Sequence, residues 1–291
     1  MNARLEKSDV IPSSYTVDGG ASWHLPSGSP FQIPNLCGLA QPSLQRPQNT
    51  PNFLFQDAAL LLVVSGNLTL QNEAMTTVAN SGGSLLLIQP GTSANLIKKP
   101  GGHEQRFRSV FMTFAPQLLE FFDRNRPNVK NSREPSSMYQ IALDTDLEST
   151  LLLVCNSICT SNLSEERVRY RLLDLLAGLA EHGHYYRRNH SPNTAGRLRA
   201  LLAAAPGFQW TAHIAGRELA MSEATLRRRL AQENARFEDL LVDVRMHHGL
   251  MLVQTTDWSI IRIAEASGYR SRARFAERFK QRFGYLPSSV R

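Results

Sequence analysis

Two different spacings of hydrophobic residues divide the chain. Between residues 58 and 114, short apolar runs alternate with turns rich in glycine, proline and asparagine. The pattern predicts strands over residues 58–64, 67–70, 75–78, 84–88, 94–98 and 107–114. Regularly spaced short strands of this kind indicate an antiparallel sandwich or barrel.

A helical spacing replaces the strand spacing after Pro116. It predicts helices over residues 117–124, 144–159, 165–181, 197–205 and 236–253. Ser164 is suited to cap the helix over residues 165–181, because a serine hydroxyl accepts a hydrogen bond from a free N–H of the first turn. That helix carries a continuous apolar stripe, formed by Val168, Leu172, Leu175, Leu176 and Leu179.

The polar run at residues 189–196 predicts a linker between two domains. A chain of 291 residues is long enough for both. We therefore expect an α+β protein, with an antiparallel β domain and flanking helices in residues 1–188 and an all-α domain in residues 197–291. Residues 1–50 predict a loosely ordered arm with short edge strands near 15–17 and 33–39, and residues 139–188 are predicted to be helical.

The C-terminal domain repeats one layout of two short helices joined by a turn. In residues 210–232, Thr211 opens a helix, residues 219–221 form the turn, and Ser222 starts the segment ATLRRRLAQ. In residues 259–283, helices over 260–266 and 272–283 flank a turn at Gly268. The small residues that let the paired helices approach are Ala215, Gly216, Ala264 and Ala266. These are two helix-turn-helix units, whose second helix fits the major groove of DNA.

The charge of the chain is concentrated in the same domain. Residues 197–291 contain 16 Lys and Arg residues against 9 Asp and Glu, whereas residues 1–196 contain 16 of each. The formal net charge of +7 therefore belongs entirely to the C-terminal domain. A basic surface attracts the phosphate backbone of nucleic acid, so the charge supports a DNA-binding function.

The C-terminal domain resembles the AraC/XylS family of bacterial transcription regulators. The residues that carry the resemblance are Trp210, Thr211, Met221, Ser222, Leu226, Leu230, Arg245, Met246, Ile263, Ala264, Gly268, Tyr269, Phe275, Phe279, Lys280, Phe283, Gly284 and Pro287. The resemblance implies a sequence-specific regulator, more often an activator than a repressor, which binds double-stranded DNA near a promoter and contacts RNA polymerase. No catalytic activity and no cofactor are expected of such a protein.

The resemblance and the helical wheel agree on the reading residues of the first unit. The family's base-contacting positions fall on Ala224, Arg227 and Arg228, and the wheel places Arg228 opposite Leu226 and Leu230. In the second unit the corresponding face holds Arg272, Ala273, Arg274 and Glu277. The family commonly has a basic residue where this chain has Glu277, so that residue either accepts from a cytosine amino group or orients Arg274.

Contacts with the DNA backbone are expected from Thr211, Ser222, Arg229, Arg245, Arg270 and Lys280. Arg245 could equally pair with a neighbouring side chain. The turn of the first unit has Ala220 where the family usually has glycine. Because a positive φ would cost an alanine about 1 kcal/mol, this turn is expected to take a different form.

The N-terminal domain resembles the cupin-like sensory domain that often precedes such a DNA-binding half. That resemblance leaves three roles open: binding a small-molecule effector, binding a regulatory protein, or a purely structural or dimerising function. The apolar stripe over residues 168–179 either pairs with its copy in a homodimer or covers the β domain of its own chain.

A metal-dependent cupin enzyme with a DNA-binding appendage is the alternative function. Such enzymes hold their metal with paired histidines and a glutamate, yet no His-x-His follows Gly91, and His103 and Glu104 are adjacent. No metal site is therefore expected. A DNA-repair methyl acceptor needs a reactive cysteine cluster, which Cys37 alone does not provide. The absence of a secretory h-region and of long apolar runs leads us to expect a cytoplasmic protein with no membrane partner.

Overall fold

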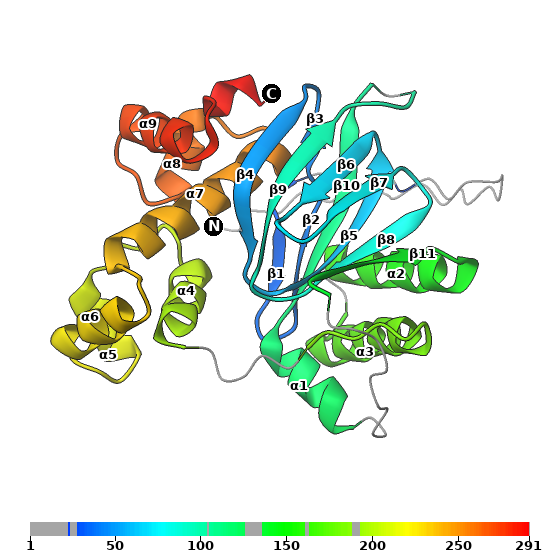
Figure 1. Ribbon diagram of the computed structural model, residues 1–291, viewed down its shortest axis with the longest axis horizontal. Helices are drawn as coiled ribbons and strands as arrows, with labels where there is room; N and C mark the ends of the chain where they lie inside the picture. Colours follow the sequence, from blue (N-terminus) through cyan, green and yellow to red (C-terminus); the bar gives the residue numbers. More distant parts are fainter. Residues whose placement is uncertain are drawn as a thin grey trace, which may run out of the picture.

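A computed structural model gives the structure of the chain. It describes residue 23 and residues 28–103, 105–125, 136–160, 163–187 and 193–290. Two domains lie side by side, a β domain with helices on one face and a helical C-terminal domain at one end (Figure 1). The predicted α+β architecture is therefore confirmed.

The β domain consists of two antiparallel sheets. In the first sheet the strand order is β1-β2-β10-β5-β8-β11, with β3 beside β10, and in the second it is β4-β9-β6-β7. The strands are β1 (Phe31–Ile33), β2 (Cys37–Ala40), β3 (Ser43–Leu44), β4 (Gln48–Phe55), β5 (Ala58–Ser65), β6 (Asn67–Gln71), β7 (Thr76–Asn80), β8 (Ser84–Ile88), β9 (Thr92–Lys99), β10 (Phe107–Phe114) and β11 (Met138–Ala142).

The central strand β5 is apolar on both faces because both faces are covered. Leu60 and Leu62 contribute to the core beneath the helices, whereas Leu61 and Val63 contribute to the core between the two sheets. Successive side chains of a strand point to opposite faces, so a strand buried on both sides shows a continuous apolar run instead of an alternation. This explains the near-uniform sequence of the strand.

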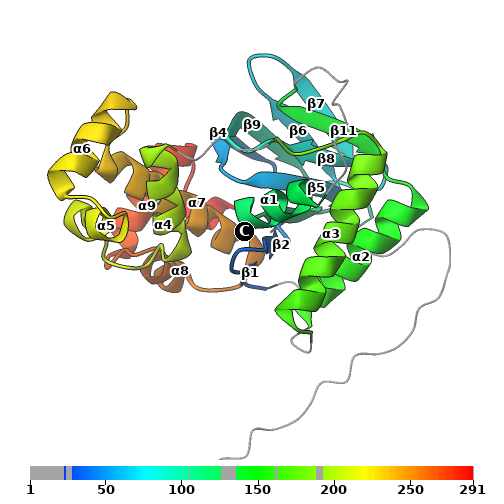
Figure 2. The same ribbon diagram turned by 90° about the horizontal axis from the view of Figure 1, so that it is seen from below.

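Three helices cover the outer face of the first sheet. They are α1 (Pro116–Arg124), α2 (Thr145–Cys159) and α3 (Glu165–Glu181), and Figure 2 shows α2 and α3 side by side on the β domain. The Ser164 hydroxyl accepts from the backbone N–H of Arg167, as its capping position predicts.

The apolar stripe of α3 is buried inside its own chain. Its residues Val168, Leu172, Leu175, Leu176 and Leu179 are at most 3% exposed and belong to the core shared with α2 and the first sheet. The prediction that this stripe forms a dimer interface is therefore wrong. The stripe is needed to cover the β domain, which leaves none of it for a second subunit.

The C-terminal domain is helical throughout its regular structure. It contains α4 (Thr194–Ala204), α5 (Ala212–Glu218), α6 (Glu223–Gln232), α7 (Phe237–Thr255), α8 (Ile260–Ala266), α9 (Arg272–Phe283) and a short 3₁₀ helix, η1 (Pro287–Ser289). Helix α4 begins three residues before its predicted start, because the Asn193 side chain caps it and Glu233 accepts from the N–H groups of Thr194 and Ala195. Part of the predicted linker is thus helix.

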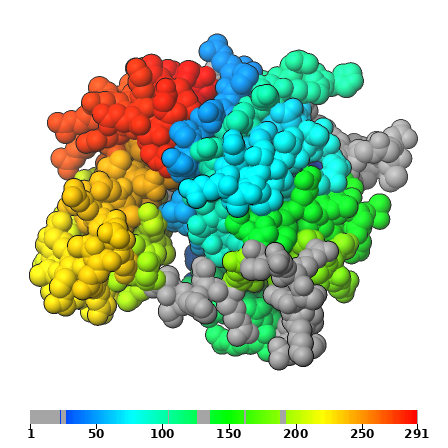
Figure 3. Space-filling view, in the orientation of Figure 1, coloured from blue at the N-terminus to red at the C-terminus, as the bar shows by residue number. Residues whose placement is uncertain are grey.

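The two helix-turn-helix units have separate cores. The first unit packs its leucines against α4 and the start of α7, with Leu198, Leu226, Leu230 and Leu240 at the centre. The second unit packs Phe275, Phe279 and Phe283 into a cluster that continues into the core of the β domain. Figure 3 shows the red second unit in direct contact with the blue segment that contains β4.

Strands β3, β4 and β11 lie where the sequence did not predict them. Strand β4 was missed because Pro51 interrupts its pattern, and in the structure this proline lies at a register shift between Thr50 and Phe53 on an edge strand. Residues 138–142, predicted as part of a helical region, form the edge strand β11. The predicted strand at residues 33–39 is divided by a turn at Asn35, and its second half, β2, is an interior strand. The predicted strand at residues 15–17 lies outside the described residues.

None of the helices in the described part of the chain combines the length and apolar character needed to cross a bilayer.

Candidate DNA-binding surface

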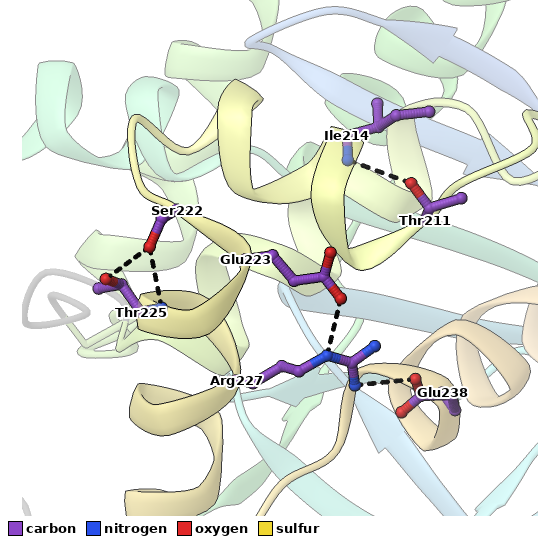
Figure 4. A network of polar contacts seen from close by, with 7 residues as sticks. All are labelled: Thr211, Ile214, Ser222, Glu223, Thr225, Arg227 and Glu238. Carbon is purple, nitrogen blue, oxygen red and sulfur yellow. Dashed lines mark hydrogen bonds and ion pairs between the residues drawn. The ribbon is translucent and has the colours of Figure 1, made fainter.

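Side-chain caps start the two helices of the first helix-turn-helix unit, and a tight turn joins them. The hydroxyls of Thr211 and Ser222 accept from the N–H groups of Ile214 and Thr225 and so start α5 and α6 (Figure 4). A Cβ on Gly216 would lie 2.9 Å from the carbonyl oxygen of Met221, so only glycine permits this approach.

The turn itself has the left-handed form. Ala220 has φ of 57°, the conformation for which glycine is usually required. The expectation that an alanine would change the form of this turn is therefore wrong. The packing of α5 against α6 holds Ala220 in the strained conformation.

Helix α6 presents one polar face outward. Leu226 and Leu230 are buried, whereas Ala224, Arg227, Arg228 and Arg229 are exposed. Within the described ranges, the side chains of Arg228 and Arg229 form no hydrogen bond or ion pair with the protein. Their guanidinium groups are thus available to a ligand outside the chain.

Arg227 is exposed but already paired. Its Nε donates to Oε1 of Glu223 at 3.0 Å, and its Nη1 donates to Oε1 of Glu238 at 3.0 Å. Both hydrogen bonds raise the pKa of Arg227, and the one with Glu223 has the larger effect. Figure 4 shows the guanidinium between the two carboxylates. The sequence did not predict this arrangement, since Glu238 belongs to α7.

Helix α9 of the second unit has the same division into a buried and an exposed face. Phe275, Phe279 and Phe283 are buried to at least 98%, and their rings pack in sequence, Phe275 tilted against Phe279 and Phe279 edge to face with Phe283. The exposed residues of α9 include Arg272, Ala273, Arg274, Glu277 and Lys280, together with Arg278 and Gln281, and Arg270 is exposed just before the helix. Each predicted reading residue of this unit is therefore exposed, and their contact with DNA stays a prediction.

Arg245 does not belong to the exposed surface. Its Nε donates to the carbonyl oxygen of Pro206 at 3.1 Å, its Nη2 donates to that of Phe208 at 2.8 Å, and its guanidinium lies against Gly268 and the ring of Tyr269. Burial lowers its pKa. These two hydrogen bonds join the loop after α4 to α7, and the phosphate contact of Arg245 stays a prediction.

Arg282 connects the reading helix α9 to the β domain. Its Nε donates to Oδ1 of Asp243 on α7 at 3.0 Å, and its two Nη groups donate to the carbonyl oxygens of Pro51 and Asn52 in β4 at 3.0 and 2.7 Å. Sequence reasoning missed this residue. Only the fold brings α9, α7 and β4 together, and no local pattern signals that.

A buried lysine lies at the same boundary. Lys98 of β9 is 7% exposed, and its Nζ donates to Oε1 of Gln254 on α7 at 2.9 Å. Burial lowers its pKa from the ordinary 10.5 to about 7. Beside it is a cavity of about 30 Å³ lined mainly by apolar side chains of both domains, including Phe53, Phe111 and Leu250. That volume holds one or two water molecules.

The residues considered for metal or thiol chemistry are dispersed or buried. Among the described residues, no three His, Cys, Asp or Glu side chains are grouped closely enough to hold a metal ion. His103 lies in the turn between β9 and β10, and Glu104 lies outside the described residues. Burial raises the pKa of the Cys37 thiol to about 12 and also raises that of Cys155, so both thiols remain protonated and unreactive.

Comparison with known proteins agrees with a helix-turn-helix assignment for the C-terminal domain. A family profile for the helix-turn-helix domain matches residues 215–291. The HTH-type transcriptional regulator YdeO of Escherichia coli strain K12 is 32% identical over 98 residues, which cover 34% of this chain and 38% of that protein. The urease operon transcriptional activator of Escherichia coli is 26% identical over 148 residues, 49% of this chain and 50% of that protein. The matched region thus spans half or less of each relative.

Solved structures of a full two-domain protein share the fold. Apo ToxT K231A from Vibrio cholerae strain SCE256 superposes with a TM-score of 0.61 over 87% of this chain and 96% of that chain, at 13% identity. Wild-type ToxT from the same strain, with unsaturated fatty acid bound, gives a TM-score of 0.59 over 91% and 96%, also at 13% identity. The structural likeness extends to both domains, whereas the family profile matches residues 215–291. Residues 215–291 are thus a helix-turn-helix domain, and the C-terminal domain is similar to those of these transcription regulators, as its resemblance to the AraC/XylS family predicts.

Proposed function

We propose that this protein is a sequence-specific DNA-binding transcription regulator that reads two adjacent major-groove segments with α6 and α9. The observation that carries the proposal is the presentation of two capped, arginine-bearing helices on a single scaffold. Helix α7 joins the two units with 19 residues, a length of about 28 Å. This approaches the ~34 Å that separate successive major-groove faces of one duplex.

Base reading in the first unit is assigned to Ala224, Arg227 and Arg228. Exposure of all three on the side of α6 opposite its buried leucines supports this assignment. Thr211, Ser222 and Arg229 are assigned to the phosphate backbone. Thr211 and Ser222 lie at helix N-termini, where free backbone N–H groups favour an anion, and Arg229 supplies a positive charge.

The second unit is assigned chiefly to holding the backbone. Arg270, Arg272, Arg274 and Lys280 supply positive charge. Glu277 is assigned to orienting Arg274 on the bound DNA instead of reading cytosine, since in the described residues of the free protein the two side chains form no ion pair. A Glu277→Ala variant decides between these roles. An altered preference at one base pair of the bound site would assign Glu277 to base reading.

Selection of bound sequences from a random pool of double-stranded DNA tests the proposed function. We expect an enriched site with two segments whose centres lie about 10 base pairs apart, matching one helical turn. Enrichment of no sequence above the starting pool would contradict the proposal.

Regulation is assigned to the boundary between the domains. The second unit shares its core with the β domain, and Arg282 joins α9 to β4. A change in the conformation of the β domain would therefore alter the position of α9 relative to α6. We assign the N-terminal domain the role of modulator, through a small-molecule effector or a regulatory protein, with contact to RNA polymerase and activation as the output.

The interdomain cavity supports one class of effector. ToxT has been solved with unsaturated fatty acid bound. In the present chain Lys98 and an apolar lining would suit a molecule with one carboxylate and an apolar body. Such a molecule would need a cavity larger than the one of about 30 Å³ in this structure, so we assign its binding to a change in the contact between the two domains. Titration of the protein with medium-chain and long-chain fatty acids, followed by DNA binding, tests this assignment.

A further inference from the structure

Arg227 differs from Arg228 and Arg229 in having its guanidinium engaged by the protein. Glu223 is the first residue of α6 and lies one turn before Arg227, whereas Glu238 reaches the same guanidinium from the first turn of α7. The side chains of the three residues are 41–61% exposed. Their mutual contacts therefore form at the surface and are not a by-product of burial.

The two carboxylates occupy only part of the donor capacity of Arg227. A guanidinium has five N–H donors, of which Glu223 takes the one on Nε and Glu238 takes one on Nη1. One N–H on Nη1 and both on Nη2 remain. A bidentate contact with the O6 and N7 atoms of guanine needs two N–H groups, so the paired arginine retains enough donors to read that base.

We propose that Glu223 and Glu238 are positioning residues that hold Arg227 ready to read one base pair and keep it from engaging phosphate. This role rests on the proposed function. A free arginine loses side-chain freedom when it docks on a base, and the two contacts have already removed part of that freedom. Part of the side-chain entropy of Arg227 is thus lost when the protein folds and need not be lost when it binds DNA.

The net charge of the three side chains bears on the second part of the proposal, that Arg227 is kept from engaging phosphate. One guanidinium with two carboxylates has a net charge of −1, so this cluster adds nothing to the general attraction toward the DNA backbone. Arg228 and Arg229 have no such partners in the described part of the chain and supply that attraction. Arg227 therefore contributes to the choice of sequence with little gain in non-specific affinity.

The variants Glu223→Gln and Glu238→Gln test the proposal. Dissociation constants are measured for the selected site, for its single-base variants and for unrelated DNA, each over a range of salt concentrations. We expect discrimination at one base pair to fall roughly three- to tenfold, as the loss of one or two exposed ion pairs allows, while binding to unrelated DNA strengthens. Glu218→Gln, which removes the same charge from the exposed end of α5, is the matched control and should leave discrimination at that base pair unchanged.

A double-mutant cycle with Arg227→Ala separates positioning from a general charge effect. If Glu238 acts through Arg227, Glu238→Gln has no effect on discrimination once Arg227 is absent. An equal loss of affinity at every base pair, or an unchanged effect of Glu238→Gln in the Arg227→Ala background, would overturn the inference. If the wild-type protein selects no sequence at all, it is the proposed function that fails.

Discussion

The Nζ of Lys98 in β9 lies 2.9 Å from Oε1 of Gln254 in α7 and joins the β domain to the helix that carries both reading units. The contact continues as a chain of polar side chains. Gln254 donates to Gln48 of β4 at 2.6 Å, and Gln48 donates to the hydroxyl of Tyr285, which follows α9. Four segments that are distant in the sequence are thus linked inside the boundary between the domains.

Lys98 should make the stability of the protein depend on pH. Its folded pKa of about 7 lies below the unfolded value of 10.5, so between these values the unfolded state binds more protons. Stability should therefore rise with pH across this window, by up to about 1.4 kcal/mol per pH unit. The destabilisation is fully present below pH 7. Urea unfolding at pH 7 and pH 9 measures the rise, and Lys98→Met should abolish it.

His247 provides an internal control for that experiment. Burial lowers its pKa below the ordinary 6.5, so its protonation affects stability only below about pH 6.5. A rise between pH 7 and pH 9 that persists in Lys98→Met would show that another group is responsible.

Arg282→Ala should loosen the second unit from the β domain. The substitution removes three hydrogen bonds, one of them an ion pair with Asp243, from a side chain that is 21% exposed. A loss of about 1.5–3 kcal/mol in the free energy of unfolding is expected. Arg282→Lys should not restore it, because a single ammonium cannot reach the three acceptors in the geometry of the guanidinium fork. Restoration by lysine would mean that charge alone maintains the contact.

Arg228→Ala should weaken specific DNA binding by about 1–3 kcal/mol if the arginine reads guanine. Binding to unrelated DNA should fall far less, since only one of many positive charges is lost. Fluorescence anisotropy with the selected site and with a scrambled duplex gives both values. Equal losses on the two duplexes would assign Arg228 to the phosphate backbone.

Leu175→Ala should destabilise the folded subunit instead of dissociating a dimer. Leu175 is fully buried in the core between α3 and the first sheet, so its truncation should cost about 2–5 kcal/mol. Tyr170 lies on the same helix but is 60% exposed, and Tyr170→Ala should change stability by no more than about 0.5 kcal/mol. Thermal unfolding and sedimentation velocity on both variants distinguish the two effects.

Ala220→Gly should stabilise the protein by about 1 kcal/mol. The residue has φ of 57°, where the Cβ of alanine is strained and glycine is not. Ala231→Gly is the matched control, because Ala231 lies within α6 and glycine there should cost up to about 1 kcal/mol. If the two substitutions changed the free energy of unfolding in the same direction, the strain assigned to Ala220 would be contradicted.

The sequence determined the elements that depend on local chemistry. Ser164, Thr211, Ser222 and Gly268 mark helix ends and turns through hydrogen bonds and φ values that involve only nearby residues, and helices α8 and α9 have the predicted bounds. The exposed arginines of α6 were likewise evident, since the spacing of Leu226 and Leu230 fixes which face is buried.

The tertiary structure decided everything that requires two distant segments to meet. It buried the α3 stripe beneath the first sheet, placed Arg245 against the carbonyls of Pro206 and Phe208, and brought Glu238 to Arg227. An apolar stripe looks the same whether a sheet or a second subunit covers it, and an arginine looks the same whether it faces DNA or a carboxylate. Those choices depend on the packing of whole domains, which no local spacing of residues encodes.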